Sequence, residues 1–116
     1  MKRILLVAIG LLSLLSVQAW AGDYQKEINH LLNYIKTTSC EYERNGTTYK
    51  GSEAVVHVQK KYDYFKDKIA SAEDFVRLCA TKSELTGRAY HVQCPSEAKQ
   101  ESASWLLKEL KQFRQP

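Results

Sequence analysis

One stretch of this sequence decides the fold: Cys79-Ala-Thr-Lys-Ser-Glu-Leu-Thr-Gly-Arg-Ala-Tyr-His-Val-Gln-Cys94, in which a predicted helix ends and a predicted strand begins. Thr86-Gly87 marks a turn, and the five residues of Ala89–Gln93 have the composition and length of a strand. Exposed polar loops between rigid elements often carry binding or catalytic residues. We therefore expect any functional site to involve the loop Ser83–Tyr90.

Apolar residues on both sides of this stretch recur at the three- and four-residue spacing of amphipathic helices. This spacing predicts helices from Asp23 to about Thr37, from Gly51 to Ile69, from Ser71 to about Thr81, and from Pro95 onward. We expect Trp105 on a flank of the last helix. Its core face is predicted to consist of Ala103, Leu106, Leu107, Leu110 and Phe113.

A hairpin precedes the second helix. Residues Cys40–Arg44 alternate in character as a strand does, and Thr47–Tyr49 would be the short return strand. The intervening Asn45-Gly46 favours a type I′ turn, because both residues tolerate positive φ. Asn45-Gly-Thr47 also matches a glycosylation sequon, but the hairpin is the simpler interpretation. The predicted fold class is α+β, mostly helical, with about four helices and a small antiparallel sheet of two or three strands.

Residues 1–21 have the pattern of a signal peptide. Lys2-Arg3 form a positive n-region, Ile4–Val17 an apolar h-region, and Ala19-Trp-Ala21 a small-x-small cleavage site. The apolar segment is shorter than the roughly 20 residues that a transmembrane helix needs. We expect cleavage after Ala21, leaving residues 22–116 as one globular domain that does not span the membrane and is periplasmic or secreted.

The charge of the mature chain argues against a nucleic-acid partner. Without Lys2 and Arg3, the 17 basic residues fall to 15 against 13 acidic ones, so the net charge is only +2. The two signs are interspersed, and no basic block forms a phosphate-binding footprint. We expect the partner to be a protein or a small ligand of the cell envelope.

Three cysteines permit at most one internal disulfide after export. Cys40 opens the first strand and Cys94 closes the last, so an antiparallel pairing would place them nearly opposite each other. Cys79 with Cys94 is the rival pairing, and three reduced cysteines are the other alternative. We favour Cys40–Cys94, because Cys79 follows the helical core spacing. No spacing matches a zinc site, and we predict no metal and no cofactor.

The second helix carries the strongest candidates for chemistry. His57 and Lys61 lie one turn apart, and Arg44 would be close if the hairpin packs on that face. His57 would then be an acid or base, with Lys61 and Arg44 binding an anion. The alternative is a histidine at the core boundary beside a solvated lysine. We favour the alternative, because no carboxylate or nucleophile is tied to these residues by spacing.

Several motifs, taken in order, resemble a bacterial family of short exported proteins catalogued as a domain of unknown function. They are Cys40-x-x-x-Arg44-Asn-Gly46, Ala54-x-x-His57-x-x-x-Lys61, Asp74-Phe75, Ser83-x-x-x-Gly87-x-x-Tyr90 and Trp105-Leu106. The resemblance covers nearly the whole mature chain and implies a cell-envelope or secreted protein, but no activity. The family tends to have Gly-Lys-Pro-Tyr where this chain has Gly87-Arg-Ala-Tyr90. The motifs nominate as a site Arg44, Asn45, His57, Lys61, Ser83, Gly87 and Tyr90.

Three functions are compatible with these observations. The first is a non-enzymatic envelope protein that binds a partner or small ligand through the Ser83–Tyr90 loop. Its predicted binding residues are those nominated above together with Thr86. The second is a small hydrolase or transferase that uses His57 as acid or base, with Lys61 and Arg44 on an anionic group. The third is an inhibitor of a hydrolase, because Thr86-Gly-Arg-Ala-Tyr90 is similar to the Ser-Gly-x-x-Tyr loop of bacterial periplasmic lysozyme inhibitors.

Overall fold

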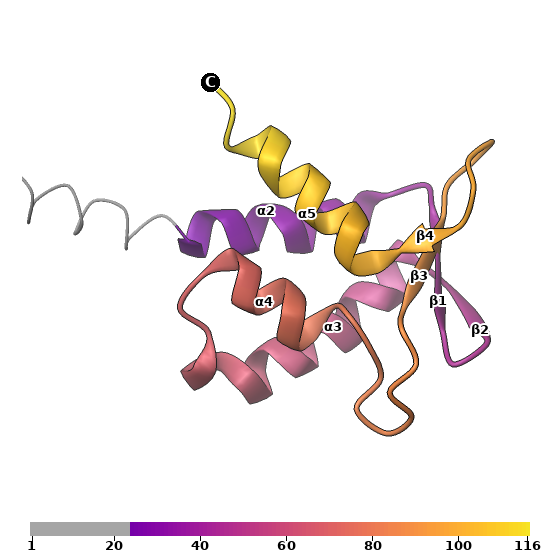
Figure 1. Ribbon diagram of the computed structural model, residues 1–116, viewed down its shortest axis with the longest axis horizontal. Helices are drawn as coiled ribbons and strands as arrows, with labels where there is room; N and C mark the ends of the chain where they lie inside the picture. The colour runs from indigo at the N-terminus through magenta and orange to yellow at the C-terminus, as the bar shows by residue number, and fades with distance from the viewer. Residues whose placement is uncertain (1–23) are drawn as a thin grey trace, which may run out of the picture.

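The computed structural model describes residues 24–116, so the predicted signal peptide lies outside the described residues. The fold is α+β and mostly helical, as predicted (Figure 1). No helix within residues 24–116 combines the length and the apolar character needed to cross a membrane. The elements are α2 (Tyr24–Thr37), β1 (Glu41–Arg44), β2 (Thr47–Lys50), α3 (Gly51–Phe65), the 3-10 helix η1 (Lys66–Lys68), α4 (Ala72–Cys79), β3 (His91–Gln93), β4 (Gln100–Glu101) and α5 (Ser102–Phe113).

The sheet has four antiparallel strands in the order β2-β1-β3-β4, slightly more than the two or three expected. The hairpin between β1 and β2 is confirmed: Asn45 and Gly46 both have positive φ, at 52° and 81°. The helices gather on one side of the sheet in Figure 1. Tyr42 and Val92 are paired across β1 and β3 and are both buried, so they lie on the face that the helices cover.

The helix expected from Pro95 is wrong, because α5 begins only at Ser102. Residues 95–99 form a turn in which Ser96 has a φ of 61°, a conformation that does not continue a right-handed helix. Gln100 and Glu101 then pair with β3 as the fourth strand. The backbone N–H of Ser102 donates to the carbonyl of Tyr90 over 2.9 Å, which ties the start of the helix to the sheet.

The core face of α5 differs from the predicted one. Trp105 is buried rather than on a flank, because its ring packs against Tyr34 and Tyr42 at centroid distances of 4.6 and 5.9 Å. Leu107 and Phe113 are 42% and 43% exposed, so they are not core residues. Leu106 and Leu110 are buried, as predicted. The helix is therefore rotated toward the aromatic side chains of α2 and β1.

The second and third helices end earlier than predicted, at Phe65 and Cys79. Ile69 is still buried, but it lies beyond α3, after the 3-10 helix. The predicted cap of α4 is confirmed, since the hydroxyl of Ser71 accepts a hydrogen bond of 3.0 Å from the N–H of Asp74. These shorter helices leave residues 80–90 free to form the loop beside α3.

The structure forms the favoured disulfide, Cys40–Cys94, and not the rival pairing. Glu41 pairs with Gln93 in the register of β1 and β3, so the cysteines are the next opposed positions. Their Cα atoms are 4.1 Å apart. Cys79 is free and fully buried, as its helical spacing predicted. The disulfide thus closes one end of the sheet, and the candidate site lies at the other.

Candidate functional site

The candidate site is built where the inner faces of β1 and the segment before β3 reach α3. Side chains two residues apart lie on the same face of a strand. Arg44 therefore follows Tyr42 on the inner face, and Tyr90 precedes Val92 on that face. Because α3 packs against β1 and β2, its His57 and Lys61 meet these two side chains.

Arg44 bonds to His57, as the sequence predicted if the hairpin packed on that helix face. The guanidinium Nη2 lies 3.2 Å from Nε2 of His57 and 3.3 Å from the hydroxyl of Tyr49. Arginine can only donate, so Nε2 accepts and the imidazole is neutral. Burial lowers the pKa of His57, and the nearby charges of Arg44 and Lys60 lower it further.

Arg44 is half-buried, and no carboxylate among residues 24–116 forms an ion pair with it. Its Nε is buried and has no hydrogen-bond partner in this part of the chain. An uncompensated buried donor on a charged group is costly, so such groups mark places where a partner is expected. The arrangement can accept an anionic group.

The loop Ser83–Tyr90 is held to the hairpin by side chains. The amide of Asn45 donates to the hydroxyl oxygen of Ser83 over 3.2 Å and accepts from the hydroxyl of Thr86 over 2.7 Å. The N–H of Gly87 donates to the carbonyl of Ser83 over 2.9 Å, and Gly87 has a φ of 73°. Asn45, Thr86 and Gly87 thus shape the loop.

Lys61 crosses from α3 to the other side of this loop. Its Nζ donates to the carbonyl of Lys82 over 2.7 Å and to the hydroxyl of Tyr90 over 3.4 Å. Glu84 lies 3.4 Å from the same Nζ, and the side chain of Lys61 is only 17% exposed. The ammonium group is therefore positioned and only partly compensated by an exposed carboxylate.

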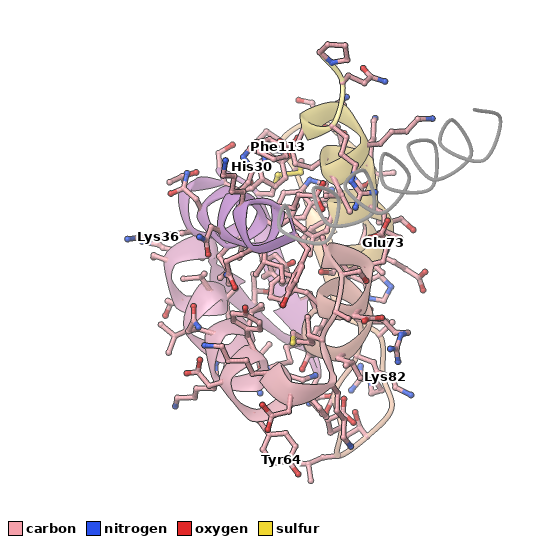
Figure 2. All side chains as sticks on the ribbon, turned by 90° about the vertical axis from the view of Figure 1, so that its left-hand side faces the viewer. His30, Lys36, Tyr64, Glu73, Lys82 and Phe113 are labelled. Atoms are coloured by element: carbon pink, nitrogen blue, oxygen red, sulfur yellow. A yellow bond between two sulfur atoms is a disulfide. The ribbon has the colours of Figure 1, made fainter. Side chains whose placement is uncertain are left out.

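A cleft of about 560 Å³ opens between α3 and the loop. Figure 2 shows Tyr64 and Lys82 at the same end of the molecule, away from His30 and Phe113. Four of the predicted site residues line this cleft, together with five that the sequence analysis did not nominate. The lining residues are Arg44, Lys61, Ser83 and Tyr90, joined by Lys60, Tyr64, Phe65, Glu84 and Leu85.

Two hydroxyl groups of the cleft retain a proton to donate. The oxygen of Tyr90 accepts from Lys61, and the oxygen of Ser83 accepts from Asn45 and from the N–H of Thr86. Both side chains are buried, with 6% and 5% of their surface exposed. Because each oxygen is already an acceptor, its O–H remains available to donate, and a bound anion would supply an acceptor.

A family model matches residues 22–114 and describes a family of unknown function, DUF5329. The chain belongs to this family. This confirms the resemblance to a domain of unknown function. An uncharacterized protein, YfeK of Salmonella typhimurium, is 33% identical over 94 residues, which cover 78% of this chain and 77% of that protein. No solved structure matches the chain significantly.

Not every nominated residue of this DUF5329 chain reaches the cleft. His57 instead borders a smaller apolar hollow, which shares Arg44 and Tyr90 with the cleft. The ring of His57 meets that of Tyr49 edge-on there, at a centroid distance of 5.5 Å. Within residues 24–116, no three His, Cys, Asp or Glu side chains gather closely enough to hold a metal ion. Two signals could have indicated the missed residues: the Lys60-Lys61 pair, and Leu85 as an isolated apolar residue in a polar loop.

Proposed function

We propose that this chain is an exported, non-enzymatic binding protein of the cell envelope that takes an anionic ligand in the cleft between α3 and the Ser83–Tyr90 loop. One observation carries the proposal: the positive charges of Arg44 and Lys61 and the donor hydroxyls of Ser83 and Tyr90 line the same cleft. Hydrogen bonds between charged groups and anions are the strong ones in proteins.

The cleft also has the dimensions of a ligand site. Small-molecule sites typically have volumes of roughly 300–1,000 Å³, with a few polar groups converging on the ligand. At about 560 Å³, the cleft lies within that range. Only Glu84 among its lining residues is acidic, and its side chain is 56% exposed, so it can move away from an entering anion.

The geometry supports the alternative functions less well. Acid–base catalysis needs a group within reach of a substrate, whereas His57 borders the smaller hollow and uses Nε2 to accept from Arg44. A hydrolase inhibitor would need a free hydroxyl at the tip of the loop. The hydroxyl of Thr86 is already bonded, donating to Asn45 and accepting from the N–H of Arg88.

Export is supported by two observations, the signal-peptide pattern of residues 1–21 and the disulfide Cys40–Cys94. Disulfides persist in oxidising compartments such as the bacterial periplasm. The mass of the protein recovered from a periplasmic fraction tests this part of the proposal. A chain that begins at Gly22 is expected, and recovery of the full-length chain from the cytoplasm alone would contradict it.

Binding is tested by incubating the purified protein with periplasmic extract and measuring the mass of the recovered protein under native conditions. The wild type is expected to carry a small anion, and Arg44→Gln and Lys60→Glu are expected to lose it. Lys60 is exposed, so we expect its substitution to leave the fold intact. Lys111→Gln on α5 is the matched control. An unliganded wild type, or equal retention by all variants, would overturn the proposal.

A further inference from the structure

We infer that the ligand of this cleft is amphiphilic: a small oxyanion bound at the basic end and an apolar chain or ring lying across the mouth. This inference rests on the proposed function and names its ligand class. It is drawn from the side chains around the opening, which the binding of a simple anion does not need.

The basic end is the inner part of the cleft. Arg44 is half-buried and Lys61 is 17% exposed, while the hydroxyls of Ser83 and Tyr90 lie between loop and helix. The Arg44 and Lys61 side chains can only donate, and the Ser83 and Tyr90 oxygens already accept, which leaves their O–H groups to donate. Of the groups around the Lys61 ammonium, the exposed Glu84 carboxylate is the one that an anion would replace. A carboxylate or phosphate offers several acceptor oxygens and no donor, so it complements this set.

The mouth is apolar and exposed. Tyr64 and Leu85 are 83% and 95% exposed, and they are two of the five exposed large hydrophobic side chains within residues 24–116. Both line this cleft, together with the half-buried Phe65. The rings of Tyr64 and Phe65 meet edge-on at 4.8 Å, which places an aromatic wall opposite the loop.

Single exposed apolar residues are common, but their concentration around a charged cleft is informative. Covering Leu85 and Tyr64 would remove apolar surface from water, which is favourable by roughly 25 cal/mol per Å². A small inorganic anion held at Arg44 and Lys61 would leave both uncovered. A ligand with an apolar group attached to its anionic end would contact both parts of the cleft.

The test uses octanoate as the probe, followed by the amide chemical shifts of the purified protein. Octanoate is expected to shift residues around Lys61, Ser83 and Leu85, and to bind at least about tenfold more tightly than acetate, which lacks the tail. Octanol, which lacks the charge, is expected to bind at least about tenfold more weakly than octanoate. Equal binding of octanoate and acetate, or of octanoate and octanol, would overturn the inference.

Variants separate the two ends of the ligand. Leu85→Ser is expected to weaken octanoate binding about fivefold and to leave acetate unchanged. Lys60→Glu is expected to weaken octanoate about tenfold. Val56→Ser is the matched control for Leu85→Ser, because Val56 is also an exposed apolar residue, 51% exposed on α3, but does not line the cleft. An equal loss with Val56→Ser would contradict the inference.

The amphiphile could be free or part of a lipid, and vesicles of phosphatidylglycerol and phosphatidylethanolamine distinguish these sources. If the protein sediments with the vesicles and octanoate abolishes this binding, the ligand is part of a lipid. Binding of octanoate without cosedimentation would assign a free amphiphile. Cosedimentation that octanoate does not affect, with no shifts in the cleft, would overturn the inference. If periplasmic extract supplies a cleft-bound anion but octanoate does not bind, the inference fails and the proposed function stands.

Discussion

Arg44 and His57 are joined by a hydrogen bond of 3.2 Å in which the guanidinium donates and the imidazole accepts. The bond links the end of β1 to the middle of α3, and Arg44 also lines the cleft. It also fixes the protonation state of the histidine, because a protonated imidazole has no acceptor to offer. The half-buried position and the cation beside it both lower the pKa of His57.

This relationship predicts a pH dependence of stability. The folded-state pKa of His57 lies below the ordinary value of about 6.5, so the unfolded chain binds more protons as the pH falls. His57 therefore contributes stability above about pH 6.5, which is lost toward the folded-state pKa at no more than about 1.4 kcal/mol per pH unit. Urea unfolding across this window measures the change.

The cause of the shift is tested by proton NMR of the His57 ring. Its titration midpoint is expected below about 6.5 in the wild type and closer to that value in Arg44→Gln, since one of the two neighbouring charges is removed. Lys111→Gln, on another helix, is the matched control. A wild-type midpoint at or above the ordinary value, or no change in Arg44→Gln, would contradict the assignment.

The sequence predicted the parts of this fold that depend on local geometry. Asn45-Gly46 specifies its turn by itself, and Cys40 with Cys94 are opposed once the strands pair. The prediction of a helix from Pro95 was wrong because proline is only a local signal for a helix start. Gln100 and Glu101 instead pair with β3 as a strand. Pairing with a distant strand overrides a local propensity, and residues 95–101 alone do not reveal it.

The positions of the candidate site residues were predictable in part. Arg44, Lys61, Ser83 and Tyr90 were nominated and do line the cleft, but the separation of His57 into its own hollow is a tertiary property. The exposed side chains of the mouth were missed because exposure depends on how the loop lies over α3. Leu85 shows this most clearly: its sequence position is visible, but its 95% exposure is not.

The disulfide is expected to contribute strongly to stability. Cys40 and Cys94 are 54 residues apart, and the chain-entropy model assigns a loop of that length about 4 kcal/mol. The double substitution Cys40→Ser with Cys94→Ser should lower the free energy of unfolding by a similar amount in guanidinium titrations. Cys79 remains unchanged in this variant, so its loss cannot account for the result. A variant as stable as the oxidised wild type would contradict the prediction.

Cys79 is expected to be unreactive in the folded protein. Its side chain is fully buried, and burial raises the pKa of the thiol to about 11. The thiolate is the reactive form, so labelling by dithionitrobenzoate should occur only after denaturation. In the native oxidised protein no thiol should react, and one should react in denaturant. Rapid labelling of the native protein would contradict the buried position.

Gly51 is expected to be intolerant of any side chain. A Cβ atom there would lie 2.1 Å from the carbonyl oxygen of Ile35 and 3.0 Å from Cγ2 of Thr38. The start of α3 would have to move away from the end of α2, so Gly51→Ala should cost about 3 kcal/mol in urea unfolding. Gly87→Ala is the control, because only its positive φ opposes it and about 1 kcal/mol is expected. Equal costs would refute the close approach.

Asn45 is expected to order the loop independently of its role in the turn. Asn45→Gly keeps a residue that tolerates the φ of 52° but removes the amide that bonds to Ser83 and Thr86. Without that tie, the amides of Gly87 and Arg88 should exchange with deuterium about tenfold faster, corresponding to roughly 1.4 kcal/mol of easier local opening. Global stability should change by less than about 0.5 kcal/mol.

Thr47→Ala is the matched control for this substitution, because Thr47 is exposed on the same hairpin and lies outside the loop network. It should leave the exchange of residues 83–88 unchanged. If Asn45→Gly lowered the free energy of global unfolding by as much as the free energy of local opening, the amide would stabilise the whole fold rather than the loop. If neither changed, the loop would be held by Lys61 and its backbone contacts alone, and the hairpin would have no part in shaping the cleft.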